Sequence, residues 1–297
     1  MQNSTMTNYT RSETFFKGYN HSKLFLQTWS CADAIGTIFF THGHGEHSDS
    51  YHRLISGLDN IKDSKKWNFV GWDMCGFGRS DGSRGYAANF NEYVLDYDLF
   101  IKEALKIDFV QNKKIVLFSH SMGGLVQICG LLENKYSEQF PQIVGQILSA
   151  PLTGVAVSVP AWKDVGANLF NQLLPKFALD TGLNNEMLTR DPDVIREFER
   201  DTYRHQKMSS GVYLGMKQEF LKIFDRANEI TVPTQLIMSD SDPVNSSPEA
   251  LRFFDLLSST KKSLKIFDGA KHELINDTCR NDVFKIISEF LQQLGGA

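Results

Sequence analysis

The sequence has few cysteines, and none of them are closely spaced. Its 297 residues include only Cys31, Cys75, Cys129 and Cys279, and no two of these form a CxxC pair. Structural zinc sites and small disulfide-rich domains both depend on closely spaced cysteines, so neither is indicated. We therefore expect four free thiols in a reducing compartment.

Long apolar runs are also missing. No stretch approaches the ~20 consecutive apolar residues that a transmembrane helix requires. Residues 1–30 are polar and lack the apolar run of a signal peptide. The sequence therefore predicts a cytoplasmic protein without a membrane span.

Basic clusters are absent as well. The chain carries 31 Lys and Arg residues against 35 Asp and Glu residues, spread along its length for a net charge of -4. Nucleic-acid binding needs grouped Lys and Arg side chains, so we expect no nucleic-acid partner. With 41% hydrophobic and 22% charged residues, the composition is that of an ordinary globular protein.

Short apolar segments alternate with amphipathic ones along most of the chain. Three segments, 51–58, 90–97 and 283–290, repeat apolar residues at helical spacing. The expected strands are 36–40, 68–72, 115–118, 143–148, 235–238 and 263–267. Such alternation predicts an α/β fold with a mostly parallel, doubly wound sheet, which binds ligands at the carboxyl ends of its strands.

The alternation fails between about Leu152 and Ala227, where helical patterns dominate. We expect a core formed by 1–152 and 229–297, with a helical cap inserted over 153–228. Part of this cap carries an apolar face made of Trp162, Val165, Leu169, Phe170, Leu173 and Leu174. A helix packed on its own domain would show the same pattern. Our substrate-binding candidates on this face are Trp162 and Phe170.

A candidate nucleophile follows the expected strand at 114–118. The segment there reads Ser119-His120-Ser121-Met122-Gly123-Gly124 and leads into an apolar helical run. In a nucleophile elbow, a sharp strand-to-helix turn lifts the middle serine above the sheet edge. Ser119 replaces the usual first glycine and is expected to accept a more strained backbone. A serine that caps a helix in a phosphate-binding fold is the alternative interpretation of Ser121.

A glycine-containing loop follows the first expected strand. It reads Thr41-His42-Gly43-His44-Gly45-Glu46-His47-Ser48. This is the position from which an α/β hydrolase donates one amide of its oxyanion hole. We therefore predict that the backbone N–H groups of His44 and Met122 form the oxyanion hole, which leaves the side chain at position 44 free to vary.

Candidates for the acid and the base follow the last two expected strands. Asp240 and Asp242 both come after 235–238, and we prefer Asp242 because it lies deeper in the loop. Either residue could instead be an ordinary loop or cap residue. His272 follows 263–267, which gives the chain order Ser, Asp, His that this kind of fold uses. A single histidine is more often structural, but a base at this point completes the triad.

Several segments resemble those of one known group of enzymes. Residues 42–48, the glycine-rich segment 73–85 and the segment 188–193 are similar to the corresponding motifs of the monoacylglycerol lipase and lysophospholipase group of α/β hydrolases. The resemblance extends over about residues 14–291. It implies an α/β-hydrolase fold and an esterase for one-chain acyl lipids, with a cap above the acyl tunnel.

The predicted mechanism is that of a serine hydrolase. Ser121 attacks an ester carbonyl, His272 accepts its proton, and Asp242 orients the imidazole. This chemistry requires no metal and no organic cofactor. A small-ester esterase or aminopeptidase on the same fold, and a ligand-binding receptor without activity, are the alternatives. The apolar face of the cap further predicts peripheral, reversible membrane contact.

Overall fold

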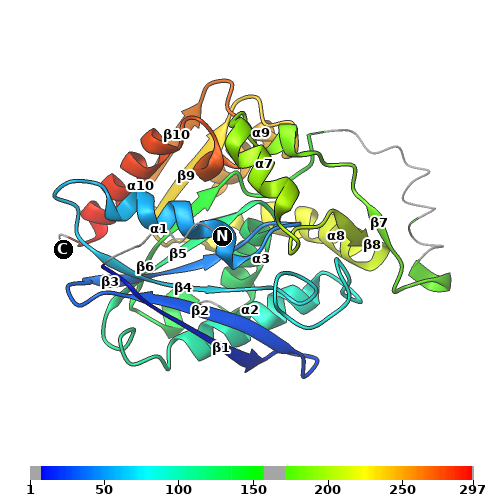
Figure 1. Ribbon diagram of the computed structural model, residues 1–297, viewed down its shortest axis with the longest axis horizontal. Helices are drawn as coiled ribbons and strands as arrows, with labels where there is room; N and C mark the ends of the chain where they lie inside the picture. The colour runs from blue at the N-terminus through cyan, green and yellow to red at the C-terminus, as the bar shows by residue number, and fades with distance from the viewer. Residues whose placement is uncertain (1–7, 135, 157–166, 168–170, 296–297) are drawn as a thin grey trace.

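The computed structural model describes residues 8–134, 136–156, 167 and 171–295. Its centre is an eight-stranded sheet in the order β1-β2-β4-β3-β5-β6-β9-β10 (Figure 1). All six strands expected from the sequence are present, which confirms the predicted α/β-hydrolase fold class. The strands are β1 (Thr10–Lys17), β2 (Lys23–Ser30), β3 (Gly36–Thr41), β4 (Trp67–Trp72), β5 (Lys114–His120), β6 (Ile143–Ser149), β9 (Thr234–Ser239) and β10 (Lys262–Phe267).

Two strands, β1 and β2, had not been expected. They form an antiparallel pair, and β2 also runs antiparallel to β4, whereas the pairs from β4 to β10 are parallel. Strand β1 is exposed at every position except Phe16. Strand β1 therefore lacks the buried apolar run that identifies β3, β4, β5, β6 and β9.

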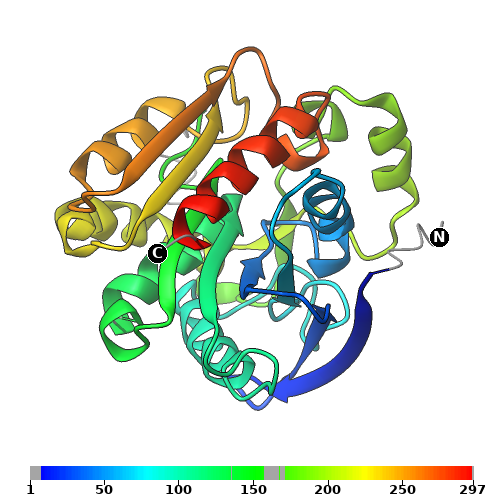
Figure 2. The same cartoon turned by 90° about the vertical axis from the view of Figure 1, so that its left-hand side faces the viewer.

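Helices cover both faces of the sheet. One face packs against α1 (His52–Asp59) and α10 (Arg280–Gly295), which lie side by side in Figure 2. The other face packs against α2 (Asn91–Ala104), α3 (Ser121–Asn134), α8 (Ser210–Arg226) and α9 (Ser247–Leu256). Short helices complete the core, namely α4 (Tyr136–Gln139), η1 (Ser48–Tyr51), η2 (Ala227–Glu229) and η3 (Leu274–Asn276).

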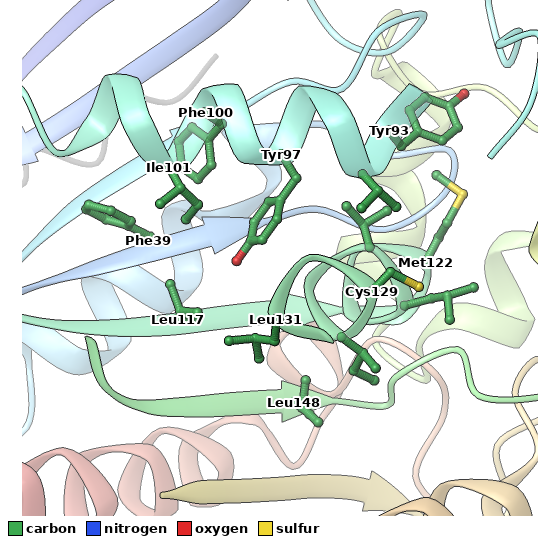
Figure 3. Close-up of a cluster of buried hydrophobic side chains, with 14 of the residues drawn as sticks. Phe39, Tyr93, Tyr97, Phe100, Ile101, Leu117, Met122, Cys129, Leu131 and Leu148 are labelled. Carbon is green, nitrogen blue, oxygen red and sulfur yellow. The ribbon is translucent and has the colours of Figure 1, made fainter. Parts of the chain in front are cut away.

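The two faces form separate hydrophobic cores because side chains alternate along a strand. In β3, Phe39 joins the core beneath α2 and α3, whereas Ile38 and Phe40 join the core beneath α1 and α10. Figure 3 shows the first core, where Tyr97 of α2 points toward Leu117 of β5. Full burial of one large apolar side chain contributes roughly 2 kcal/mol, so this core stabilises the packing of β5 against α3 on either side of the elbow.

The segment between β6 and β9, residues 150–233, is here called the insertion. It contains β7 (Ala178–Asp180), α6 (Asn185–Leu188), α7 (Pro192–Arg200) and β8 (Lys207–Ser209) before α8, and β7 and β8 lie beside α8 at the right of Figure 1. The expected helical cap therefore also contains two strands, because β7 and β8 pair antiparallel. Strands of three residues are too short to show a periodic pattern.

Only part of the expected apolar face of the cap lies within the described residues. Trp162, Val165, Leu169 and Phe170 lie outside them. The remaining two members, Leu173 and Leu174, are 68% and 55% exposed and do not pack into a core. Among the described residues, no helix is long and apolar enough to cross a membrane.

Candidate active site

The turn between β5 and α3 has the geometry of a nucleophile elbow. Ser121 is the first residue of α3, and its φ of 50° lies in the left-handed region that non-glycine residues rarely adopt. A Cβ at Gly123 would lie 2.3 Å from the carbonyl oxygen of His42, and one at Gly124 would lie 2.8 Å from the Cβ of Pro151. Only glycine fits at these two positions, which explains the small residues after Ser121.

The strain expected at Ser119 is instead found at Ser121. Ser119 is an ordinary residue of β5 that pairs with Thr41 and Leu148, and its φ is not among the positive ones. Serine at this position is instead unfavourable for stability because its hydroxyl is buried. Its Oγ has no hydrogen-bond partner among the described residues. The prediction of a strained Ser119 was therefore wrong.

The three residues of the predicted triad meet at the carboxyl ends of β5, β9 and β10. Nε2 of His272 lies 2.8 Å from Oγ of Ser121, and Nδ1 of the same ring lies 2.7 Å from Oδ2 of Asp242. Ser121 and Asp242 thus contact the two ring nitrogens of one histidine. These contacts join residues 151 and 30 positions apart in the sequence.

The hydrogen bonds fix the proton positions. Burial alone would raise the pKa of the Asp242 carboxyl, but His272 and the backbone N–H groups of Val244 and Asn245 outweigh burial and lower it. An ionised Asp242 only accepts, so Nδ1 of His272 donates to it. Nε2 then carries the lone pair that accepts the hydrogen bond of the Ser121 hydroxyl.

The base is held in a charged environment. Burial disfavours the imidazolium form of His272, but the carboxylates of Asp242, Glu273 and Glu46 outweigh burial and raise its pKa above the ordinary 6.5. A more basic imidazole accepts the serine proton more readily.

The neighbouring Asp240 is arranged differently. Its carboxylate is exposed and accepts hydrogen bonds from the Ser241 hydroxyl and from the backbone N–H of Gly269. It therefore connects two loop segments at the surface, whereas Asp242 contacts the buried imidazole of His272.

The loop at residues 42–47, here called the oxyanion loop, packs directly on the nucleophile. A Cβ at Gly43 would lie 3.0 Å from the Cβ of Ser121. Among the hydrogen bonds of the described residues, none involves the backbone N–H of His44 or of Met122. Both groups are therefore available to a ligand. Burial lowers the pKa of the His44 imidazole to about 3, so this ring is uncharged.

The structure brings four further residues to the site that were not predicted as site residues. His120 lies with its ring centroid 4.7 Å from that of His272, and burial lowers the pKa of His120 to about 4. Glu46, Glu273 and Arg204 form a buried charged group beside the base. The first three lie within or next to the motifs of the elbow, the oxyanion loop and His272, whereas Arg204 has no such signal.

A cavity of about 850 Å³ opens above Ser121. Its walls are largely apolar and come mainly from the insertion and from the loop after β9. They include Leu152, Leu188, Phe198, Met208, Met216 and Val244. A cavity of this size and polarity suits a ligand with a hydrocarbon chain. Within the described ranges, no group of three or more His, Cys, Asp or Glu side chains is arranged to hold a metal ion.

Comparison with known proteins agrees with this geometry. A family model described as serine aminopeptidase, S33, matches residues 32–279, which is well over half of the chain. Phospholipase YtpA of Bacillus subtilis (strain 168) is 30% identical over 271 residues, covering 90% of this chain and 98% of the relative. Monoglyceride lipase of Homo sapiens is 27% identical over 268 residues, covering 86% of this chain and 82% of the relative.

A solved structure shows the same fold. It is a soluble variant of monoglyceride lipase from Saccharomyces cerevisiae in complex with a substrate analog, which superimposes with a TM-score of 0.82 at 20% identity. The match covers 97% of this chain and 96% of that one. The resemblance drawn from the sequence motifs is thus confirmed. The chain belongs to the serine aminopeptidase S33 family of α/β hydrolases.

Proposed function

We propose that this chain is a serine hydrolase that cleaves the carboxylic ester of a monoacyl lipid, either a monoacylglycerol or a lysophospholipid. The observation that carries the proposal is the hydrogen-bond chain from Ser121 through His272 to Asp242, beneath a cavity with largely apolar walls. The names of two relatives, a phospholipase and a monoglyceride lipase, favour this substrate class.

In the proposed reaction, Oγ of Ser121 attacks the ester carbonyl while Nε2 of His272 accepts the hydroxyl proton. Asp242 stabilises the imidazolium that forms, and His272 then gives the proton to the leaving alcohol. Water attacks the acyl-enzyme with the same histidine as base, which releases the fatty acid and restores Ser121. These steps need no metal and no organic cofactor.

Stabilisation of the oxyanion is assigned to the backbone N–H groups of His44 and Met122. Each such donor contributes roughly 3 kcal/mol to lowering the barrier. The close packing of Gly43 on Ser121 supports this assignment, because it keeps the next residue of the loop beside the nucleophile.

We further propose that residues 153–228 act as a cap that admits the acyl chain, between core segments 1–152 and 229–297. Its surface exposes Leu173, Leu174, Phe177 and Leu179, and Leu179 also lines the cavity. Burial of such side chains in a lipid interface stabilises contact by about 25 cal/mol per Å². Peripheral membrane contact would then deliver the substrate, and Trp162 and Phe170 remain proposed substrate-binding residues.

The test is covalent labelling together with a substrate panel. A fluorophosphonate should label the purified wild-type protein on Ser121, and Ser121→Ala should remove both the label and nearly all esterase activity. The panel contains monoacylglycerols, lysophospholipids, short soluble esters and aminoacyl anilides. Preferred turnover of anilides would replace the proposal with a peptidase, and a label on another serine would refute the nucleophile.

A further inference from the structure

Three charged side chains meet in the interior beside the catalytic base. Glu46 belongs to the oxyanion loop, and Glu273 follows His272 in the loop after β10, here called the base loop (268–277). Arg204 comes from the insertion, between α7 and β8. The exposed fractions of the three side chains are 2% for Glu46, 4% for Glu273 and 9% for Arg204.

Glu46 holds the oxyanion loop in its turn. Its Oε1 accepts the backbone N–H of Gly43 at 2.5 Å and the hydroxyl of Tyr51 at 2.9 Å. Gly43 in turn contacts Ser121 and immediately precedes His44. The position of the Glu46 carboxylate therefore affects where the backbone N–H of His44, the proposed oxyanion donor, lies.

Glu273 holds the base loop against the insertion. Its backbone N–H donates to the carbonyl oxygen of Leu188 at 2.8 Å, and its carboxylate accepts hydrogen bonds from Arg204 and from the Asn276 amide. Because Glu273 is the neighbour of His272 in the sequence, these contacts help to fix the backbone from which the imidazole projects.

Arg204 is the cation shared by the two carboxylates. Its guanidinium donates to Glu273, lies 4.0 Å from Oε2 of Glu46, and covers the ring of Phe198 at 3.7 Å. A buried carboxylate without a partner is strongly destabilising. Burial and the Glu273 carboxylate raise the pKa of Glu46 to about 7, whereas Arg204 acts in the opposite direction. Arg204 therefore favours the ionised form of Glu46 where the oxyanion loop and the base loop lie together.

We infer that Arg204 is a positioning residue, which holds the oxyanion loop and the base loop in register by pairing with Glu46 and Glu273 at the same time. The insertion thus helps to position the catalytic residues as well as covering them, because Arg204 contacts both loops that carry them. This inference rests on the proposed serine-hydrolase function.

The charges around His272 give the inference a specific signature. Asp242, Glu273 and Glu46 favour its imidazolium form, and His120 adds no charge because its pKa is lowered to about 4. Arg204 is the cation that offsets the two glutamates. Its removal should raise the pKa of His272, so that the base is neutralised only at higher pH.

The experiment measures kcat, KM and the pH profile of wild type and variants on a soluble short-chain ester. Arg204→Met should lower kcat about tenfold or more and change KM far less. The acid limb, which is the fall in activity as His272 becomes protonated at low pH, should have its midpoint raised by about one pH unit. Arg204→Lys keeps the charge, but a single ammonium group cannot contact both carboxylates as the planar guanidinium does. It should therefore retain the wild-type limb while kcat stays reduced several-fold.

Arg226→Met is the matched control. Arg226 of α8 also joins the insertion to the core, because it pairs with the exposed Glu133 at the end of α3 that lies away from Ser121. Its loss should leave kcat and the acid limb close to wild type. An equal effect of Arg226→Met and Arg204→Met would reduce Arg204 to one of several general contacts of the insertion and overturn the inference.

A further variant covers the case in which Arg204→Met does not fold, as judged by circular dichroism. Glu46→Gln keeps the acceptor for Gly43 and removes the charge, so it should move the acid limb downward. The inference would be overturned if the midpoint of the acid limb were unchanged in both Glu46→Gln and Arg204→Met. It would also be overturned if Arg204→Lys had the kcat of the wild type. Failure of the proposed function would look different, because the wild-type protein itself would lack esterase activity.

Discussion

Gly43 and Ser121 are packed so closely that a Cβ on the glycine would lie 3.0 Å from the Cβ of the serine. The same Cβ would also lie 2.9 Å from Oε1 of Glu46 and 3.1 Å from Cδ2 of His120. The oxyanion loop, the nucleophile and the buried charged group therefore share one tightly packed contact. The substitution Gly43→Ala, which adds one methyl group, tests whether this packing is needed for activity.

Gly43→Ala should displace the oxyanion loop from Ser121 and move the amide of His44 away from the developing oxyanion. Loss of one such donor costs about 100-fold to 1,000-fold in kcat, so a partial displacement should cost at least about tenfold. The KM for a short ester should change little. The measurement is steady-state kinetics beside a thermal melt, and unchanged kcat in a folded variant would contradict the assignment of this loop.

The two aspartates after β9 should differ sharply. Asp242→Asn removes the charge that orients His272 and should lower kcat by several orders of magnitude, far less than additively with Ser121→Ala. Asp240→Asn alters only surface loop contacts and should retain most activity. The reverse ranking of the two variants on a chromogenic ester would exclude Asp242 as the acid.

The pH dependence follows from the raised pKa of His272. The imidazole must be neutral to accept the serine proton, and its folded-state pKa lies above 6.5 because the nearby carboxylates outweigh burial. Activity should therefore fall as the pH drops through a limb whose midpoint lies above 6.5. The rate of fluorophosphonate labelling at Ser121 should trace the same limb, and a midpoint well below 6.5 would contradict this environment for the base.

Ser119→Ala tests the polar cost of the modified elbow. The variant removes a buried hydroxyl that has no partner among the described residues and keeps the Cβ that already fits in β5. The free energy of unfolding should rise by about 1 kcal/mol, because an unsatisfied buried polar group is lost. Chemical denaturation measures this change, and a marked loss of stability would show that the hydroxyl has a stabilising partner.

Five of the parallel strands, β3, β4, β5, β6 and β9, could be predicted from the sequence because each is a short, largely buried apolar run. Strand β10 was predicted from its apolar residues, although only Phe267 is buried. The residues of the triad could be located because each follows one of these strands at its carboxyl end. Strand β1 could not be recognised, since its first five residues are polar and only Phe15 and Phe16 are apolar. Strands β7 and β8 are too short to show a pattern at all.

The buried charged group escaped prediction for a different reason. Arg204 and Glu273 are 69 residues apart, and nothing near Arg204 in the sequence marks it as buried. Lys and Arg side chains are usually exposed, so an isolated arginine in a helical region predicts a surface position. Only the folded chain shows that two carboxylates from separate loops meet at this cation.

The last prediction concerns delivery of the substrate. Leu173 and Leu174 are large apolar side chains exposed on the insertion, close in sequence to Leu179 of the cavity wall. If these side chains enter a lipid surface, Leu173→Ser with Leu174→Ser should lower turnover of long-chain monoacylglycerol in vesicles about tenfold, which corresponds to about 1.4 kcal/mol of lost apolar burial. Turnover of a soluble short ester should stay at the wild-type rate, because the double variant leaves Ser121, His272 and the oxyanion loop unchanged. Vesicle co-sedimentation supplies the independent readout, and it should show weaker binding of the double variant. An equal loss of activity on both substrates, with unchanged sedimentation, would mean that the two leucines support the fold of the insertion, and membrane docking through this surface would be refuted.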